Sequence, residues 1–356
     1  ATDASCFMIV HELPAEGRYR SARYRQTAAP FGVAPAPYPA EEFAMKGCKS
    51  WLLAVSLCAP LAAQAAEPES CASVRFADVG WTDITVTTAV TRQVLESLGY
   101  KTKVNLLSVP VTYRSLANND LDVFLGNWMP TMTNDIKQYA EKGTVETLRA
   151  NLEGAKYTLA VPQYVYDGGL RSFADIAKFS DKLGNKIYGI EPGNDGNRVA
   201  QSMIDKNAFE LGKFKLVESS EAGMLSQVQR AIRRNQWVVF LGWEPHPMNT
   251  RFQMKYLEGG DDFFGPNYGG ATIYTNVRKG YAQECANVGQ LLKNLSFTLE
   301  MENKLMDAVL NENKKPEEAA KAWLKDHPEQ LDAWLAGVTT RDGQPAAAAA
   351  KLAFAK

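Results

Sequence analysis

Apolar positions in the first part of the chain alternate between two spacings. Short apolar runs indicate strands, and apolar residues three and four positions apart indicate amphipathic helices. Short loops join the two kinds of segment, which is typical of a parallel sheet covered by helices. The predicted order is strand 73–79, helix 84–98, strand 103–109, helix 111–118 and strand 121–125.

The alternation returns in the second half of the chain and then gives way to helices alone. Apolar runs predict strands at 157–162, 186–190, 214–218, 237–243 and 271–277. Helical spacing separates several of these runs, at 198–206 and 221–235. The C-terminal part has only helical spacing, at 281–292, 298–311, 316–327 and 331–336.

The pattern divides into two α/β blocks, and the chain passes between them twice. The passages lie near 160–170, where 163–169 has neither spacing, and near 255–272. We therefore expect an α/β fold of two lobes joined by two crossing segments, with a ligand cleft between the lobes that closes by a hinge motion. The expected boundaries are 67–162 for the first lobe, 163–268 for the second lobe, 269–340 for the return to the first lobe and 341–356 for an alanine-rich tail that frays.

Four aromatic residues lie at the rims of apolar runs, beside glycine, proline or polar residues that break regular structure. They are Trp81, Trp128, Tyr157 and Trp243. Each residue alone is more often a buried core aromatic. In α/β sheets, however, ligands bind beyond the carboxyl ends of strands, and these rims are shared between both lobes. Together they predict a box of aromatic faces for a quaternary ammonium cation.

Two polar residues near these rims are candidates for contacts with the rest of a ligand. Asp83 lies two residues after Trp81, at the start of a predicted helix. One possibility is that Thr82 or Asp83 caps this helix. The other is that Asp83 faces the cation or a ligand hydroxyl. Asn194 lies in the glycine-rich loop 191–197 that opens a helix, where N–H groups can meet a polar ligand group. An ordinary turn is the alternative for this loop.

Composition and charge exclude several classes of function. The chain has 356 residues, of which 46% are apolar and 22% charged, as in a globular protein of one large or two medium domains. Its formal net charge is −1, so nucleic acid is not an expected partner. The sequence has no motif for a serine nucleophile, a phosphate loop or a dinucleotide turn. His246 lacks metal-ligand spacing and is expected to be structural or to line the cleft. We expect no enzyme activity, no metal and no cofactor.

Residues 45–66 have the organisation of a secretory signal peptide. Two lysines follow Met45, an apolar run comes next, and Ala63-Gln64-Ala65 is a small-x-small cleavage site. The apolar run is too short to span a membrane comfortably, so the pattern predicts export. Residues 1–44 precede this signal, and we interpret them as an over-extended reading frame.

Cleavage after the signal would leave two cysteines in the exported chain, Cys71 and Cys285. Two cysteines in an oxidising compartment indicate one disulfide. Such a bridge would join the region of the first strand to a C-terminal helix. Two free buried thiols are the alternative.

Short motifs around the four aromatic residues, in their order along the chain, resemble those of a known transport family. The motifs are Gly80-Trp81-Thr82-Asp83, Gly126-Asn127-Trp128-Met129-Pro130, Tyr157 and Gly242-Trp243-Glu244-Pro245. Together with a signal peptide and two lobes, they are similar to the choline-binding substrate-binding proteins of ABC importers. That group belongs with the glycine betaine and other quaternary-amine binders of the type II periplasmic binding protein fold. The resemblance covers about residues 67–340.

The resemblance implies a role for each candidate residue. The box around a trimethylammonium group would consist of Trp81, Trp128, Tyr157 and Trp243. Asp83 and Asn194 would lie near the charge and the hydroxyl end of the ligand, and Cys71 and Cys285 would form the disulfide of the family. The protein would be a periplasmic monomer that delivers choline to the permease subunit of an ABC transporter. The extension at 1–44 departs from the family pattern.

Two other ligands and two other classes of function stay open. Glycine betaine and carnitine carry a carboxylate, which an acidic Asp83 beside the box disfavours. A secreted hydrolase or lyase acting on a quaternary amine would need catalytic residues that the sequence does not display. A sensory receptor domain would need a membrane span after residue 67.

Overall fold

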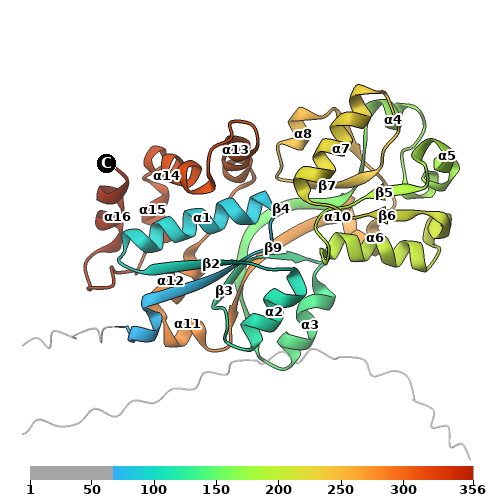
Figure 1. Cartoon of the computed structure of the whole chain (residues 1–356). Coiled ribbons are helices and arrows are strands. Elements are labelled where there is room, and N and C mark those ends of the chain that lie inside the picture. The colour runs from blue at the N-terminus through green and yellow to red at the C-terminus, as the bar shows by residue number, and fades with distance from the viewer. Residues whose placement is uncertain (1–66, 356) are drawn as a thin grey trace, which may run out of the picture. The chain divides into compact units, whose positions relative to one another are not determined.

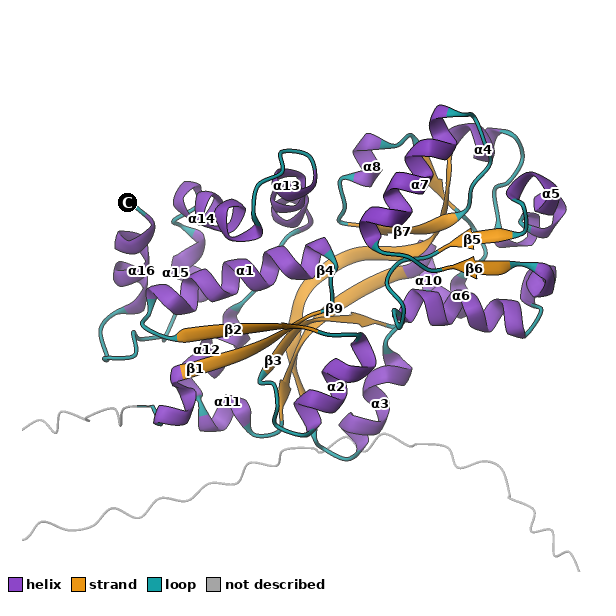
Figure 2. Ribbon diagram, in the orientation of Figure 1, coloured by secondary structure: helices purple, strands orange, loops and turns teal. Residues whose placement is uncertain are grey.

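The structure is a computed structural model that describes residues 67–355, and its strands form one mixed sheet (Figure 1, Figure 2). The order across the sheet is β2-β1-β3-β9-β4-β7-β5-β6, and β8 pairs with β4. The predicted signal peptide at 45–66 and the extension at 1–44 lie outside the described residues. The strands are β1 (Ser73–Asp78), β2 (Lys101–Leu106), β3 (Val123–Met129), β4 (Val145–Pro162), β5 (Lys186–Tyr188), β6 (Lys215–Val217), β7 (Phe240–Glu244), β8 (Met254–Tyr256) and β9 (Gly270–Arg278).

The first lobe is built on the parallel strands β2, β1 and β3, as the alternating spacings predict. One face of these strands carries α1 with α13, α14 and α16, and α2, α3 and α11 lie on the other side (Figure 1). The N-terminal end of α1 is directed toward the second lobe (Figure 1). The helices of the first lobe are α1 (Thr82–Ser97), α2 (Val109–Ala117), α3 (Thr133–Glu141), α11 (Tyr281–Glu284), α12 (Ala286–Asn294), α13 (Leu299–Leu310), α14 (Pro316–Asp326), α15 (Gln330–Trp334) and α16 (Ala346–Phe354).

The second lobe is built on β7, β5 and β6, which are also parallel to one another. α7 and α8 lie above these strands in Figure 2, and α6 lies below them. The helices of the second lobe are α4 (Gln163–Asp167), α5 (Ser180–Leu183), α6 (Asp195–Asp205), α7 (Glu221–Arg233), α8 (Met248–Arg251), α9 (Asp261–Phe264) and α10 (Pro266–Gly269).

Two long antiparallel strands, β4 and β9, join the lobes. β4 has 18 residues; its first part pairs with β9, and its last part pairs with β7 and β8 in the second lobe. The predicted crossing at 163–169 is therefore wrong, because 163–167 forms α4 of the second lobe. Exposed and half-exposed residues interrupt the apolar pattern in the first part of β4, and its strand character is hidden in the sequence for that reason.

The alanine-rich C-terminal segment is ordered rather than frayed. It forms α16, in which Ala346, Ala350 and Phe354 are buried. Alanine has the highest helix propensity, and this helix packs against α1, α14 and α15. The predicted fraying is therefore wrong for 346–354, since tertiary contacts hold the segment in place.

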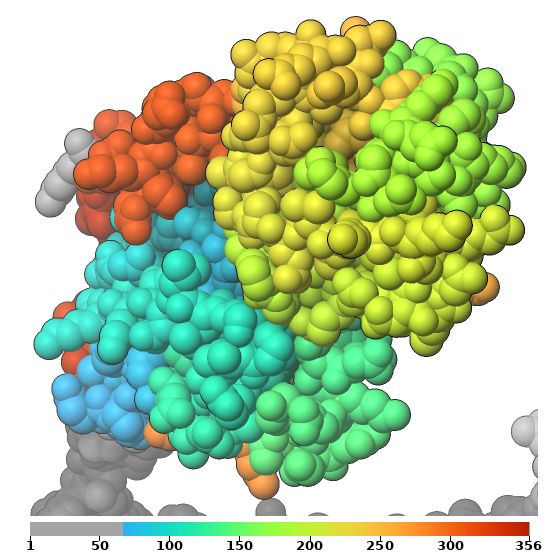
Figure 3. Space-filling model, turned by 45° about the vertical axis from the view of Figure 1, so that its right-hand side comes forward, coloured from blue at the N-terminus to red at the C-terminus, as the bar shows by residue number. Residues whose placement is uncertain are grey.

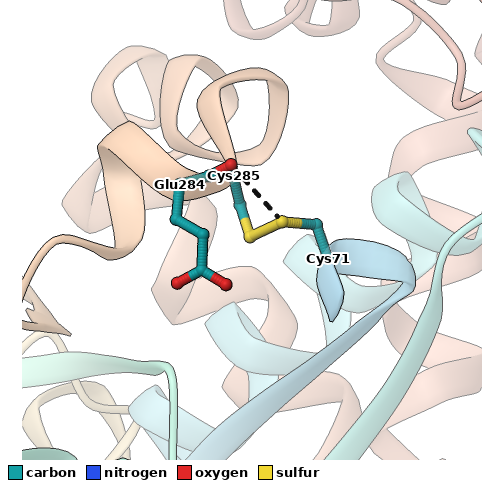
Figure 4. A group of neighbouring side chains, drawn as sticks. All are labelled: Cys71, Glu284 and Cys285. Atoms are coloured by element: carbon teal, nitrogen blue, oxygen red, sulfur yellow. Dashed lines mark hydrogen bonds between the residues drawn. A yellow bond between two sulfur atoms is a disulfide. The ribbon is translucent and has the colours of Figure 1, made fainter. Parts of the chain in front are cut away.

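The predicted disulfide between Cys71 and Cys285 is present (Figure 4). Cys71 lies in a short 3₁₀ helix (Glu69–Ala72) just before β1, and Cys285 separates α11 from α12. The predicted single helix at 281–292 is therefore two helices. Both cysteines are fully buried, and the bridge connects the two sequence segments that make the first lobe.

The two lobes touch one another along the cleft. Figure 3 shows residues of the second lobe, in yellow and green, lying directly against residues of the first lobe in cyan. Among the described residues, no helix is long and apolar enough to cross a bilayer.

Candidate ligand-binding site

A small cavity lies where the two lobes meet. Its walls come from α1, β3, β4, β7 and the loop before α6. The six ligand contacts predicted from the sequence all lie on this one cavity, and Ile190 is an additional wall residue that the sequence analysis did not single out. The lining residues are Trp81, Asp83, Trp128, Tyr157, Ile190, Asn194 and Trp243.

We call the four aromatic residues of this cavity, Trp81, Trp128, Tyr157 and Trp243, the aromatic cage. Each is at most 5% exposed. The ring of Tyr157 lies between two indoles, with centroids 5.8 Å from that of Trp128 and 6.3 Å from that of Trp243. The planes meet at 63° and 88° respectively. Rings at such angles can form adjacent walls of a box.

The positions of three of the four rings relative to their strands differ from the prediction. Trp81 does follow a strand, β1, and stands directly before the first residue of α1. Trp128 and Trp243 instead lie within β3 and β7, near their carboxyl ends. Tyr157 lies inside the long β4, opposite Trp243 in the register of the sheet. The crossing strands thus bring rings from both lobes onto one cavity.

Asp83 contributes a carboxyl group to the cavity wall. It is 1% exposed; its Oδ2 accepts a hydrogen bond from Nε1–H of Trp128 (3.1 Å), and its Oδ1 has no partner among the described residues. Burial, together with the negative charge of Glu221, raises the pKa of Asp83 to about 8. Because α1 begins at Thr82 and no side chain caps it from the residue before, the predicted capping role of Thr82 or Asp83 is wrong.

Asn194 is the N-cap of α6 and presents an amide to the cavity. Its Oδ1 accepts hydrogen bonds from the N–H of Asn197 (2.9 Å) and from the hydroxyl of Tyr157 (2.7 Å). Its Nδ2 donates to Asp195 (3.1 Å). The oxygen therefore accepts two hydrogen bonds already, and one N–H of the amide remains for a further hydrogen bond.

The surroundings of the cavity favour a cation. Its lining residues include one carboxyl group, that of Asp83, and no lysine or arginine. Asp195 lies just behind the wall, where burial raises its pKa to about 6. Two of the lining residues also carry a buried polar atom that has no partner among the described residues, Nε1 of Trp81 and Oδ1 of Asp83.

Two residues behind the cage were not recognised as part of one unit in the sequence. His246, expected to be structural or to line the cleft, is buried, and its ring centroid lies 4.7 Å from that of Trp243. Glu221, predicted only as a helix start, accepts a hydrogen bond from this imidazole. Its role depends on a contact between the two lobes, which no local pattern reveals.

Comparison with known proteins places this architecture in a transport family. A model of the substrate binding domain of ABC-type glycine betaine transport systems matches residues 72–326. An ABC-transporter choline binding protein in complex with choline is 60% identical, with a TM-score of 0.80 over 81% of this chain and 100% of that chain. A choline binding protein in an unliganded semi-closed conformation is 59% identical, with a TM-score of 0.75 over the same shares.

A curated relative carries a different ligand in its name. The glycine betaine/carnitine transport binding protein GbuC of Listeria monocytogenes serotype 1/2a (strain 10403S) is 32% identical over 163 residues. The match covers 46% of this chain and 53% of that protein. The two-lobed α/β fold of a type II periplasmic binding protein, predicted from the sequence, is confirmed by these structures. Since the family match spans well over half of its length, the chain belongs to the substrate binding domain family of ABC-type glycine betaine transport systems.

Proposed function

We propose that this chain captures choline in the periplasm and delivers it to the permease of an ABC importer. The observation that carries the proposal is the aromatic cage, closed on one side by the buried carboxyl of Asp83. A trimethylammonium group is a large, weakly hydrated cation, and aromatic faces attract it without the need for hydrogen bonds. The choline-bound structure at 60% identity supports this ligand.

The energy of such a cage suits a transport protein. Each contact between a desolvated cation and an aromatic face contributes roughly 2 kcal/mol. Four such contacts approach about 8 kcal/mol, which corresponds to a micromolar Kd. Closure of the lobes must also offset the loss of motion of ligand and protein.

The polar wall of the cavity matches the other end of choline. The free Oδ1 of Asp83 accepts a hydrogen bond from the ligand hydroxyl, and the remaining N–H of Asn194 donates to the hydroxyl oxygen. A hydroxyl group is both donor and acceptor, so one carboxylate and one amide satisfy it. The carboxylate of Asp83 also offsets the ligand's positive charge.

Glycine betaine or carnitine is the second candidate, supported by the family description and by GbuC. The carboxylate of these ligands would meet Asp83 without a lysine or arginine on the cavity wall to offset its charge. Like charges in a buried site repel one another strongly, so the cavity favours choline.

Isothermal titration with choline, acetylcholine, glycine betaine and carnitine tests the ligand. We expect choline to bind with a Kd at least tenfold lower than that of betaine, and Asp83→Asn to reduce that ratio. Tighter binding of betaine than of choline would refute the proposal. The same panel with Glu300→Gln, a change of exposed carboxylate to amide, controls for the loss of charge elsewhere.

Export and the absence of catalysis belong to the same proposal. Members of the family bind transport substrates outside the cytoplasm, and the sequence 45–66 directs this chain there as a signal peptide. The side chain of Asp83 is hydrogen-bonded to the indole N–H of Trp128. An indole cannot act as a general base, so this pair is not a catalytic dyad. We expect a monomer that releases choline unchanged; turnover of choline or acetylcholine by the pure protein would contradict this.

A further inference from the structure

α1 begins without a capping side chain from its own lobe. The residue before its first position is Trp81, which has no side-chain acceptor, so the first N–H groups need other partners. The N–H of Thr82 donates to Oε2 of Glu221 (2.8 Å), and the hydroxyl of Thr82 donates to Oε1 (2.7 Å). Since Glu221 starts α7, the cap of a helix in the first lobe comes from the second lobe.

Glu221 is itself held in position within the second lobe. Its backbone N–H donates to Oε1 of Glu191 (2.8 Å). Nδ1 of His246 accepts a hydrogen bond from the N–H of Met248 (2.8 Å), so the imidazole donates to Glu221 through Nε2 (3.0 Å). The side chains of His246 and Glu221 are 1% and 4% exposed. The carboxylate is therefore shielded from water and takes three donors in its place.

The partners of Glu221 connect it to the aromatic cage on both sides of the cleft. Thr82 lies between Trp81 and Asp83 in the sequence, so fixing Thr82 fixes both cavity residues. His246 packs against Trp243 on the opposite wall. Glu221 does not line the cavity itself.

We propose that Glu221 is a positioning residue that latches the closed lobes, joining Thr82 of the first lobe to His246 of the second. The latch rests on the proposed capture of a ligand between the lobes. It forms on closure, when the N-terminus of α1 reaches the carboxylate. It holds Trp81 and Asp83 opposite Trp243, and so prolongs the time that the ligand stays bound.

A second contact across the cleft is weaker and separate from the cage. Arg198 of α6 forms an ion pair with Asp135 of α3. The Arg198 side chain is 39% exposed, and ion pairs that water reaches contribute little. The Glu221 contacts are buried, and hydrogen bonds to a buried charged group contribute more.

Stopped-flow kinetics with choline test the latch. In Glu221→Gln, an NH₂ group replaces one of the two carboxylate oxygens that accept hydrogen bonds. Two donors then face each other, so the closed state loses hydrogen bonds while its shape stays the same. We expect the dissociation rate to rise at least tenfold, with the association rate changed less than threefold. Glu300→Gln, the same substitution on an exposed helix surface, serves as the matched control and changes neither rate.

Variants of Thr82 separate the latch from a general role in folding. Thr82→Val removes the hydroxyl and keeps the shape, so dissociation accelerates several-fold, and Thr82→Ser restores the wild-type rate. In the double variant of Thr82→Val and Glu221→Gln, the increase in dissociation rate is smaller than the product of the two single increases, because both residues act through one contact. The melting temperature of the ligand-free Glu221→Gln chain changes little, since the contact joins two lobes that each keep their own core.

X-ray scattering separates failure of the latch from failure of the choline assignment. Ligand-free Glu221→Gln has a larger mean radius of gyration than the wild-type chain, a result that needs no ligand. If choline does not bind the wild-type chain but another amine of the panel does, the choline proposal fails and the kinetics are measured with that amine. Unchanged dissociation and unchanged scattering, or a general loss of melting temperature, would overturn the latch.

Discussion

At the scale of single residues, Tyr157 connects the parts of the cavity. Its ring meets those of Trp128 and Trp243, and its hydroxyl donates to Asn194. The approach is possible because residue 196 is glycine: a Cβ at this position would lie 2.1 Å from the Tyr157 hydroxyl oxygen. Gly196 therefore matters for the cavity although it does not line it.

Gly196→Ala is expected to weaken choline binding at least tenfold, because the new methyl group displaces the Tyr157 ring from the two indoles by more than packing tolerates. Titration calorimetry measures the affinity, and circular dichroism measures the melting temperature. A loss of affinity with little change in melting temperature is the expected pair of results. Wild-type affinity would show that the ring does not depend on this glycine.

Trp128→Ala and Trp243→Ala are each expected to weaken choline binding well over tenfold, because each removes one face of the aromatic cage. Trp323→Ala is the matched control, since Trp323 stacks on Trp334 within the first lobe and lies outside the cavity. Calorimetric titration of the three variants makes the comparison. Equal affinities in all three would remove the cage from the binding mechanism.

At the scale of elements, the β-α-β-α-β beginning of the first lobe could be predicted because short apolar stretches in β1 and β3 alternate with helical spacing. β2 is more polar, with the sequence KTKVNL, and it begins two residues before the predicted strand at 103–109. The first part of β4 could not be predicted, because it contains exposed residues and shows no local apolar pattern. Its strand conformation comes from pairing with β9. α16 was missed for a related reason: an alanine-rich tail has no amphipathic pattern, and its order comes from packing on three other helices.

Some residues in and around the cavity could likewise be predicted from local sequence, and others only from the tertiary structure. The rings of the cavity could be predicted because each stands at the rim of an apolar run, beside a glycine, a proline or a polar residue. Glu221 is an ordinary residue for the first turn of a helix, and its second role appears only when α1 is brought to it. Ile190 likewise has no signal, since it ends an apolar run like many core residues.

Opening the disulfide is expected to lower the free energy of unfolding by about 4–5 kcal/mol, the range for long loops in chain-entropy models; here the bridged residues are 214 apart in sequence. Cys71→Ser with Cys285→Ser, compared with wild type in denaturant titrations, measures this loss. Choline affinity stays close to wild type, because Cys71 precedes β1 and the cavity follows its opposite end. A tenfold change in affinity would contradict that separation.

At the scale of the whole molecule, closure brings a carboxyl group into a dry cavity. In the closed chain the pKa of Asp83 is about 8, and we expect contact with water to lower it toward the ordinary value of 3.8 when the cleft opens. Between these values the closed form without ligand holds about one proton more than the open form. Closure of the ligand-free chain therefore becomes less favourable as the pH rises through this interval. When a cationic ligand is bound, its positive charge takes over the role of the proton on Asp83, so closure no longer needs that proton.

The expected result is a smaller radius of gyration for the ligand-free chain at about pH 5.5 than at about pH 8. Saturating choline keeps the chain compact at both pH values, and Asp83→Asn reduces the dependence on pH to the part that belongs to Asp195. Small-angle scattering of wild type and variant at the two pH values makes the test. Expansion toward low pH would reverse the sign and contradict the assignment to Asp83.

The placement of β9 between β3 and β4 has a consequence for the order in which the protein can be completed. A chain made from its N-terminus delivers β1 to β4 first, yet β3 lacks its antiparallel neighbour until β9 arrives. All elements from α4 to α10 emerge in the interval. The second lobe thus has its strands β5 to β8 available before the first lobe can finish, and Cys285 reaches Cys71 only at the end. The first lobe, whose earliest strands are made first, is therefore the lobe that completes its folding last.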